Sequence, residues 1–168
     1  MQISQTAYST NWPELFSLEK RKIAHDFPLK PVHFEHIGST AIENLPAHPV
    51  IDILVGLAEM PCDLDPVVAH LATLQYEYVP DLESVIPERR FFRKEIIGGI
   101  CHHIHMVMKD GQFWKRHLYY RDELRNSREL RLQYERLRVE LSKEHWPPGN
   151  EFVAIKSDFI RMVEEEFV

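Results

Sequence analysis

The sequence is poor in cysteine: its 168 residues contain only Cys62 and Cys101. A small secreted scaffold would carry several disulfides, and a thiolate zinc site would need cysteines in closely spaced pairs. The first segment, MQISQTAYSTNW, also lacks the basic start and the apolar centre of a signal peptide. These absences disfavour a disulfide scaffold and a thiolate zinc protein, and we expect a cytoplasmic protein.

The chain also lacks a long apolar run and an excess of positive charge. No apolar run approaches the roughly 18 residues that a membrane-spanning helix needs. The formal net charge is −6, whereas a protein that coats nucleic acids is normally basic. We therefore expect no membrane partner and no general binding of nucleic acids.

The composition is that of a globular protein. Hydrophobic residues make up 44% and charged residues 27% of the chain, which are typical values. A chain of this length fits one domain, residues 1–168, and can bury an adequate core without disulfides or metal. Internal repeats, low-complexity tracts and linkers are not found in the sequence.

The first part of the chain predicts a helix followed by two strands. Asn11 can cap a helix that has Pro13 in its first turn and continues to Phe27. Residues 31–37 are rich in branched and aromatic side chains, as strands are, and residues 50–57 are apolar enough for a central strand covered on both faces. The segment between them, GSTAIENLPAHP, predicts a loop with room for one helical turn.

The remaining elements complete a mixed sheet and then a helical end. Residues 63–75 predict a helix, and the segments YEYVPD, RRFFRKEI and CHHIHMVM predict strands, the last two joined in a hairpin at Gly98 and Gly99. Helices are expected at 112–126, at 127–146 and after Asn150. The order of elements indicates an α/β or α+β fold with a mixed sheet flanked by helices and with C-terminal helices.

A polar corner follows the first predicted strand. Gly38 lets the backbone turn sharply and expose N–H groups, and Ser39 and Thr40 add hydroxyl groups. Such a corner can bind a phosphate through backbone donors. The alternative is an ordinary turn, which is the usual role of Gly-Ser after a strand.

Asp52 interrupts the apolar run of the second predicted strand. A carboxylate buried there needs a partner, which could be a lysine, another hydrogen-bond donor or a metal ion. One acid in a central strand is often structural. The combination of Asp52 with an upstream Gly-Ser corner favours a functional role.

The same segment resembles the signature of a known family. EHIGSTAIENLPAHPVIDILV is similar to the motif of the GrpB family, whose fold is of the nucleotidyltransferase type. Four other segments resemble motifs of that family in the same order along the chain, namely NWPELFSLEKRKI, HIHMV, YYRDELR and AIKSDFI. The resemblance covers nearly the whole chain and implies a nucleotidyltransferase-like mixed β-sheet flanked by helices.

The resemblance implies a nucleotide or a phosphorylated small molecule as ligand. In the nucleotidyltransferase superfamily a Gly-Ser loop binds the triphosphate, and acids on adjacent strands hold Mg²⁺. Gly38, Ser39 and Thr40 match that loop, and Asp52 matches the first catalytic acid. If the protein is an enzyme, nucleotidyl transfer to an unknown small acceptor is the expected reaction.

The metal-binding pattern departs from that superfamily. The second acid of the strand is replaced by Leu54, and the segment CHHIHMV offers His103 and His105, which alternate onto one face while His102 points to the other. Asp52 with two imidazoles suits Zn²⁺, Mn²⁺ or Fe²⁺ better than Mg²⁺. We expect a divalent metal (Mg²⁺, Mn²⁺ or Zn²⁺) at Asp52, His103 and His105; the alternative is a solvated His-x-His strand face.

Other candidates are basic residues that could contact a phosphate. His48 stands where the family has a lysine, and Arg121 and Arg125 lie one helical turn apart. Lys156 lies on the apolar face of the last predicted helix and could reach Asp52 or a ligand phosphate. Solvent-exposed ion pairs for the arginines and snorkelling for the lysine are the alternatives.

His36 is a further candidate, because it precedes the Gly-Ser corner and could face the same pocket or be a satisfied strand histidine. Three functions stay open at this point. The first is nucleotide binding with nucleotidyl transfer. The second is a non-catalytic ligand- or partner-binding module on the same fold, motivated by Leu54 and His48. The third is a metal-dependent hydrolase or phosphotransferase that uses the Asp and His residues.

Overall fold

The computed structural model describes residues 6–30, 32–95 and 99–142. The helices are α1 (Trp12–Ala24), α2 (Asp65–Thr73), α3 (Gln112–Asn126) and α4 (Arg128–Ser142). The strands are β1 (Val32–Ile37), β2 (Val50–Leu57), β3 (Glu77–Tyr78), β4 (Arg90–Lys94) and β5 (Cys101–Met108). Two short 3₁₀ helices are η1 (Ser39–Ala41) and η2 (Pro80–Ser84). The helix expected after Asn150 lies outside the described residues.

The strands form one five-stranded sheet in the order β1-β2-β5-β4-β3. Strands β2 and β5 run parallel, and the other neighbouring pairs run antiparallel. The sheet is therefore mixed, as the order of elements predicted. The antiparallel pairing of β4 with β5 confirms the pairing of the predicted hairpin, while Gly98 of its predicted turn lies outside the described residues.

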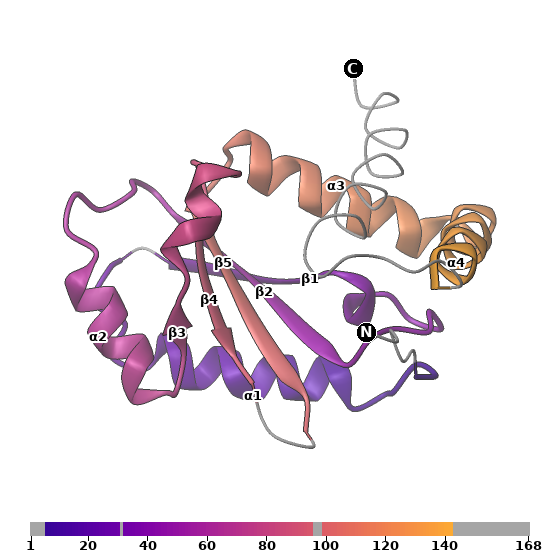
Figure 1. Ribbon diagram of the computed structural model, residues 1–168, viewed down its shortest axis with the longest axis horizontal. Coiled ribbons are helices and arrows are strands. Elements are labelled where there is room, and N and C mark those ends of the chain that lie inside the picture. Colours follow the sequence, from indigo (N-terminus) through magenta and orange to yellow (C-terminus); the bar gives the residue numbers. More distant parts are fainter. Residues whose placement is uncertain (1–5, 31, 96–98, 143–168) are drawn as a thin grey trace.

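Helices cover both faces of the sheet, which explains the nearly continuous apolar run of β2. Figure 1 shows α1 along one face and α3 along the other. Alternate residues of β2 point to opposite faces, so Ile51, Ile53 and Val55 join the core beneath α1 and α2. Leu54 joins a second cluster with Phe113 and Trp114 of α3. Asp52 shares the parity of Leu54 and therefore lies on the α3 face.

Two local predictions differ from the structure. The strand expected at 76–81 is shorter, because only Glu77 and Tyr78 pair with β4 and the chain then enters η2 at Pro80. Proline has no N–H to donate to a sheet, which accounts for the early end. Helix α1 ends at Ala24 rather than at Phe27, and Asn11 precedes it without a side-chain cap bond.

A buried polar cluster lies on the α1 face. Glu19 forms an ion pair with Lys94 and accepts a hydrogen bond of 3.1 Å from the Tyr76 hydroxyl. The Lys94 ammonium lies 4.7 Å from the centre of the Tyr76 ring. His102 is buried on the same face, as the alternation of β5 predicted, and burial lowers its pKa. These groups tie α1 to strand β4 through charge as well as through apolar contact.

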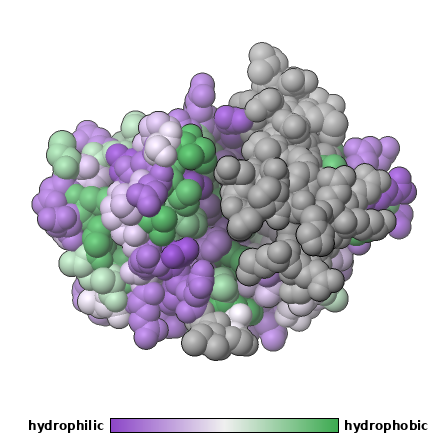
Figure 2. All heavy atoms as spheres, viewed as in Figure 1, coloured by the Kyte–Doolittle hydropathy of each residue, from purple (hydrophilic) through white to green (hydrophobic). Residues whose placement is uncertain are grey.

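The surface of the described residues mixes polar and apolar side chains. On the face shown in Figure 2, hydrophilic and hydrophobic residues alternate in small groups. The exposed large apolar side chains in the described ranges come from several parts of the chain, two of them from α4, and are Leu18, Val85, Met108, Leu132 and Val139. None of the described helices is both long enough and apolar enough to span a membrane.

Candidate metal and phosphate site

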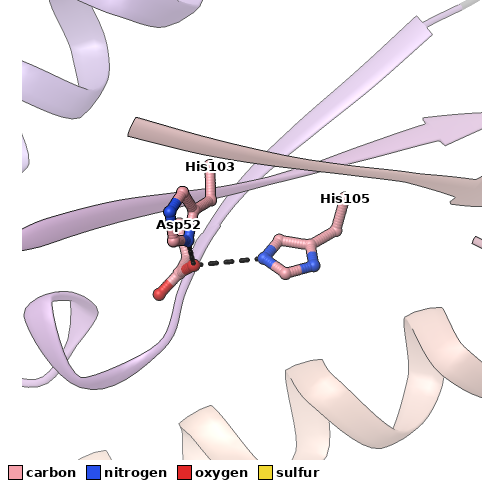
Figure 3. Close-up of side chains that lie close together, drawn as sticks. All are labelled: Asp52, His103 and His105. Carbon is pink, nitrogen blue, oxygen red and sulfur yellow. Dashed lines mark hydrogen bonds and ion pairs between the residues drawn. The ribbon is translucent and has the colours of Figure 1, made fainter. Parts of the chain in front are cut away.

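Asp52, His103 and His105 meet on the α3 face of the sheet. Strands β2 and β5 run side by side with Asp52 paired to His103 and Leu54 paired to His105. Asp52 Oδ1 lies 3.1 Å from His105 Nε2 and 3.5 Å from His103 Nδ1. Figure 3 shows both imidazole rings directed at the same carboxylate oxygen. All three side chains are partly exposed, so a small ligand can reach them.

The three side chains fit a divalent transition metal. Each offers one ligand atom, and these atoms lie within 4.8 Å of one another. One carboxylate oxygen and two imidazole nitrogens suit Zn²⁺, Mn²⁺ or Fe²⁺ and leave coordination positions for water or substrate. The second carboxylate that a two-metal site needs is not in this cluster. Leu54 stands in its place and is fully buried.

Gly38 brings the polar corner against the other oxygen of Asp52. Ile37, the last residue of β1, pairs with Asp52 across the antiparallel ladder, so the chain turns beside the carboxylate. A β-carbon built on Gly38 would lie only 2.3 Å from Asp52 Oδ2. Gly38 also has φ +74° and ψ −178°, a conformation that is essentially restricted to glycine. The Gly-Ser corner and Asp52 thus form one site.

Arg89 completes the surroundings of the cluster, and the sequence did not single it out. Its Nη1 lies 3.4 Å from His105 Nδ1, and its guanidinium lies 4.9 Å from the centre of the Phe91 ring. Its Nε is buried and has no hydrogen-bond partner within the described part of the chain. The only sequence signal is parity, since Phe91 pairs with His105 and the residue two before it faces the same side. That signal needs the register, which the sequence alone does not provide.

The contacts of His105 define its protonation state. Arginine has only donors, so His105 Nδ1 must accept from Arg89. The proton is then on Nε2, which donates to Asp52 Oδ1. Burial lowers the pKa of His105, and the hydrogen bond and charge of Asp52 only partly oppose this. His105 is therefore a neutral imidazole between an acid and a guanidinium.

Thr40 and His36 form a separate network beneath the corner. The Thr40 hydroxyl donates to the Val50 carbonyl at 2.8 Å, and His36 Nε2 donates to the same hydroxyl at 3.1 Å. His36 stacks on Phe16 of α1, with 4.8 Å between ring centres, and it pairs with Ile53. His36 therefore lies on the α1 face, opposite to Asp52. Thr40 and His36 are both buried, and they hold the loop against β2.

Arg121 and Arg125 hold α3 against β1 and η1. Arg121 donates to Glu35 at 2.6 Å, to Asp122 at 2.8 Å and to the His36 carbonyl at 3.2 Å. Arg125 donates to the Ala41 carbonyl at 3.0 Å. Glu35, on β1, is a partner that the helix sequence could not indicate. The pairing that could be expected from spacing, with Asp122, is also present.

The remaining candidates lie elsewhere. His48 is exposed just before β2, and its carbonyl accepts a hydrogen bond of 2.7 Å from Val50. Lys156 lies outside the described residues. Two cavities of about 390 and 380 Å³ lie beside Asn44, towards α4, and their linings do not include the Asp52 cluster. Arg125 lines the smaller one.

Comparison with known proteins agrees with this fold and motif order. A family model described as GrpB protein matches residues 2–166. The chain belongs to the GrpB family. This confirms the resemblance inferred from the sequence, and the match includes the C-terminal segment that carries Lys156.

Individual GrpB relatives align over most of the chain. The UPF0157 protein YqkA of Bacillus subtilis is 30% identical over 94% of this chain, but this chain spans only 45% of the length of YqkA. The UPF0157 protein BH1888 of Halalkalibacterium halodurans is 30% identical over 96% of this chain and 80% of its own length. The glutamate-rich protein GrpB of Alkalihalophilus pseudofirmus is 25% identical, with coverages of 91% and 88%.

A solved structure shares the GrpB fold. The conserved protein GrpB from Enterococcus faecalis superimposes with a TM-score of 0.81 and 32% sequence identity. The alignment covers 97% of this chain and 96% of that chain. The mixed sheet flanked by helices is therefore the fold of a GrpB protein.

Proposed function

We propose that this protein binds one divalent transition metal through Asp52, His103 and His105 and uses it to bind a nucleotide or another phosphorylated small molecule. The observation that carries the proposal is the position of the Asp52 carboxylate. One of its oxygens meets both imidazoles, and the other lies against Gly38. A metal-ligand set and a polar backbone corner thus share a single side chain.

Each group has a separate role in this proposal. Asp52, His103 and His105 would hold the metal, which supplies positive charge to a phosphoryl oxygen. Gly38 allows the backbone of the corner to approach the site closely, because a larger residue would strike Asp52. Ser39 is half-buried beside it and adds a hydroxyl group. The hydroxyl of Thr40 is already engaged by Val50 and His36, so we assign it a structural role.

Metal binding is the first test. Isothermal titration of untagged protein with Mn²⁺ and Zn²⁺ is expected to show one site per chain. Asp52→Asn should weaken the affinity by at least about a hundredfold, because it removes the only carboxylate of the ligand set. Asp65→Asn is the matched control, since Asp65 is an exposed aspartate on α2. An affinity that Asp52→Asn leaves unchanged would exclude this metal site.

Nucleotidyl transfer is a second candidate, favoured by the contact between the Gly-Ser corner and Asp52. It differs from the usual two-metal reaction, because the described cluster has one carboxylate and Leu54 occupies the position of the second. Incubation with nucleoside triphosphates, Mn²⁺ and a mixture of small hydroxyl- and amine-bearing acceptors should then release pyrophosphate as the nucleotidyl group moves to an acceptor, in a reaction that Asp52→Asn abolishes. Release of inorganic phosphate instead would indicate a hydrolase or phosphotransferase. Binding without either product would indicate a non-catalytic module.

A further inference from the structure

We infer that Arg89 is the anion-binding residue of this site and that it couples the binding of the metal to the binding of a phosphate monoester. The inference rests on the proposed function and adds the ligand class and the group that recognises it. Arg89 belongs neither to the sequence motif nor to the set of metal ligands. Its position beside His105 and its unsatisfied donor carry the argument.

The surroundings of the Arg89 guanidinium favour the binding of an anion. The guanidinium lies near the rings of Phe91 and Phe113, at 4.9 and 6.0 Å from their centres, so apolar surroundings replace much of its water. Nε is buried without a hydrogen-bond partner among the described residues. A buried unpaired donor is costly, and more so on a charged group. An oxyanion that accepts from Nε would remove that cost.

Metal binding and the contact with Arg89 require the ring proton of His105 on different nitrogens. Arg89 donates to Nδ1, which keeps the ring proton on Nε2. His105 can offer Nε2 to a metal only when that proton is absent, which in the neutral ring places it on Nδ1, facing the Arg89 donor. Two donors would then face one another beside an added positive charge. An oxyanion that accepts from Arg89 can draw the guanidinium away from Nδ1 and offset the added charge, so its binding favours metal binding and the reverse.

A phosphoryl group fits this arrangement better than a carboxylate. The groups that would bind the ligand are the two-donor fork of Arg89 and the metal, and together they require more than two oxygens from the ligand. A phosphate monoester presents three such oxygens around one phosphorus atom, whereas a carboxylate presents two in a plane. We therefore assign the site to the phosphate end of a phosphorylated molecule.

The test measures Mn²⁺ affinity by isothermal titration with and without saturating methyl phosphate. In the wild type, methyl phosphate should tighten Mn²⁺ binding by at least about fivefold, and Mn²⁺ should tighten methyl phosphate binding by the same factor. Acetate, the carboxylate probe, should change Mn²⁺ affinity by less than about twofold. Arg89→Gln should reduce the methyl phosphate effect below about twofold and leave Mn²⁺ binding alone equal or tighter, because a like charge is removed.

Arg90→Gln is the matched control, because Arg90 pairs with Met106 on the opposite face of the sheet and forms an ion pair with Glu83. This variant should keep the wild-type coupling. Arg89→Lys provides a second variant that keeps the charge and loses the fork, and its coupling should lie between those of wild type and Arg89→Gln. Circular dichroism identifies any variant that fails to fold.

The outcomes separate this inference from the proposed function. Absence of any Mn²⁺ binding to the wild type overturns both. Mn²⁺ binding that needs Asp52 but shows no coupling to methyl phosphate overturns the inference alone. Full coupling in folded Arg89→Gln, or in Arg89→Lys if the glutamine variant does not fold, also overturns it. Equal coupling by acetate and methyl phosphate overturns the phosphoryl assignment.

Discussion

Gly38 and Asp52 are in such close contact that a β-carbon on Gly38 would lie 2.3 Å from Asp52 Oδ2. The glycine is thus a requirement of the site as well as of the turn. The backbone at Gly38 has a positive φ of 74°, which L side chains rarely adopt. The corner motif and the strand acid are joined by this contact, although fourteen positions separate them in the chain.

Gly38→Ala is expected to damage both folding and metal binding. The positive φ should lower the free energy of unfolding by about 1–3 kcal/mol. The added methyl group should displace the Asp52 carboxylate and weaken Mn²⁺ affinity at least about tenfold, as is typical when the support of a metal ligand is disturbed. Urea unfolding and isothermal titration measure the two effects.

Gly111→Ala is the control for this substitution. Gly111 has φ −70°, and its added β-carbon would meet the Met108 carbonyl at 3.1 Å but no residue of the metal cluster. We expect unchanged Mn²⁺ affinity. A folded Gly38→Ala protein with wild-type affinity would contradict a role for Gly38 in holding the carboxylate.

Much of the fold follows from the sequence, because periodicity and parity are local properties. The apolar run 50–57 predicts a covered strand, and the alternation of His102, His103 and His105 predicts which side chains share a face. The structure has both features. Leu54 follows the same rule: it lies on the Asp52 side but packs against α3, so the position of a second acid has become part of the core.

The features that the sequence did not predict depend on register between distant segments. Arg89 reaches His105 only because β4 pairs with β5 at Phe91. Arg121 finds Glu35 only because α3 crosses β1. His36 faces α1 because its parity in β1 is opposite to that of Ile37. Such contacts are set by tertiary packing, and one sequence carries little information about it.

The Glu19–Lys94 ion pair should contribute to stability mainly through mutual neutralisation. Burial opposes ionisation of Glu19, but the hydrogen bond and charge of Lys94, with smaller contributions from His102 and Lys22, together outweigh it and lower the pKa of Glu19. Lys94→Met should therefore reduce the free energy of unfolding by about 3 kcal/mol, since it leaves a buried carboxylate without its main partner. Urea unfolding at neutral pH provides the measurement.

Lys22→Met is the matched control for Lys94→Met. Lys22 pairs with the same carboxylate at 3.2 Å, but its side chain is 57% exposed, so its loss should cost less than about 1 kcal/mol. The double variant Glu19→Gln with Lys94→Met should lose less than the sum of the two single variants. Additive losses would show that the two charges act independently.

Substitution of Arg121 tests whether this arginine has a structural role or binds phosphate. Its three hydrogen-bond acceptors are on β1 and α3, and it is 9% exposed. We expect Arg121→Gln to lower the free energy of unfolding by about 2 kcal/mol and to leave the methyl phosphate effect on Mn²⁺ affinity within about twofold of wild type. Arg125→Gln is the control, because Arg125 is more exposed and should cost less. A lost methyl phosphate effect at unchanged stability would instead support a phosphate role for Arg121.

His36 should make the protein less stable in mild acid. Burial lowers the pKa of His36 from 6.5 to about 4, and the charge of Asp52 only partly opposes this. The unfolded chain therefore binds a proton at this residue more readily than the folded protein. The stability that neutral His36 contributes to the folded protein is fully present above pH 6.5, and it decreases as the pH falls from 6.5 to about 4. At most, about 3 kcal/mol of the free energy of unfolding is lost in this window.

His36→Gln keeps a donor for Thr40 and removes the titration, so its free energy of unfolding, measured in urea from about pH 7 to about pH 4, should fall less steeply than that of wild type. His25→Gln is the control, since the His25 side chain is 81% exposed, and it should keep the wild-type slope. An unchanged slope in His36→Gln would mean that other groups, such as buried His102, account for the acid sensitivity.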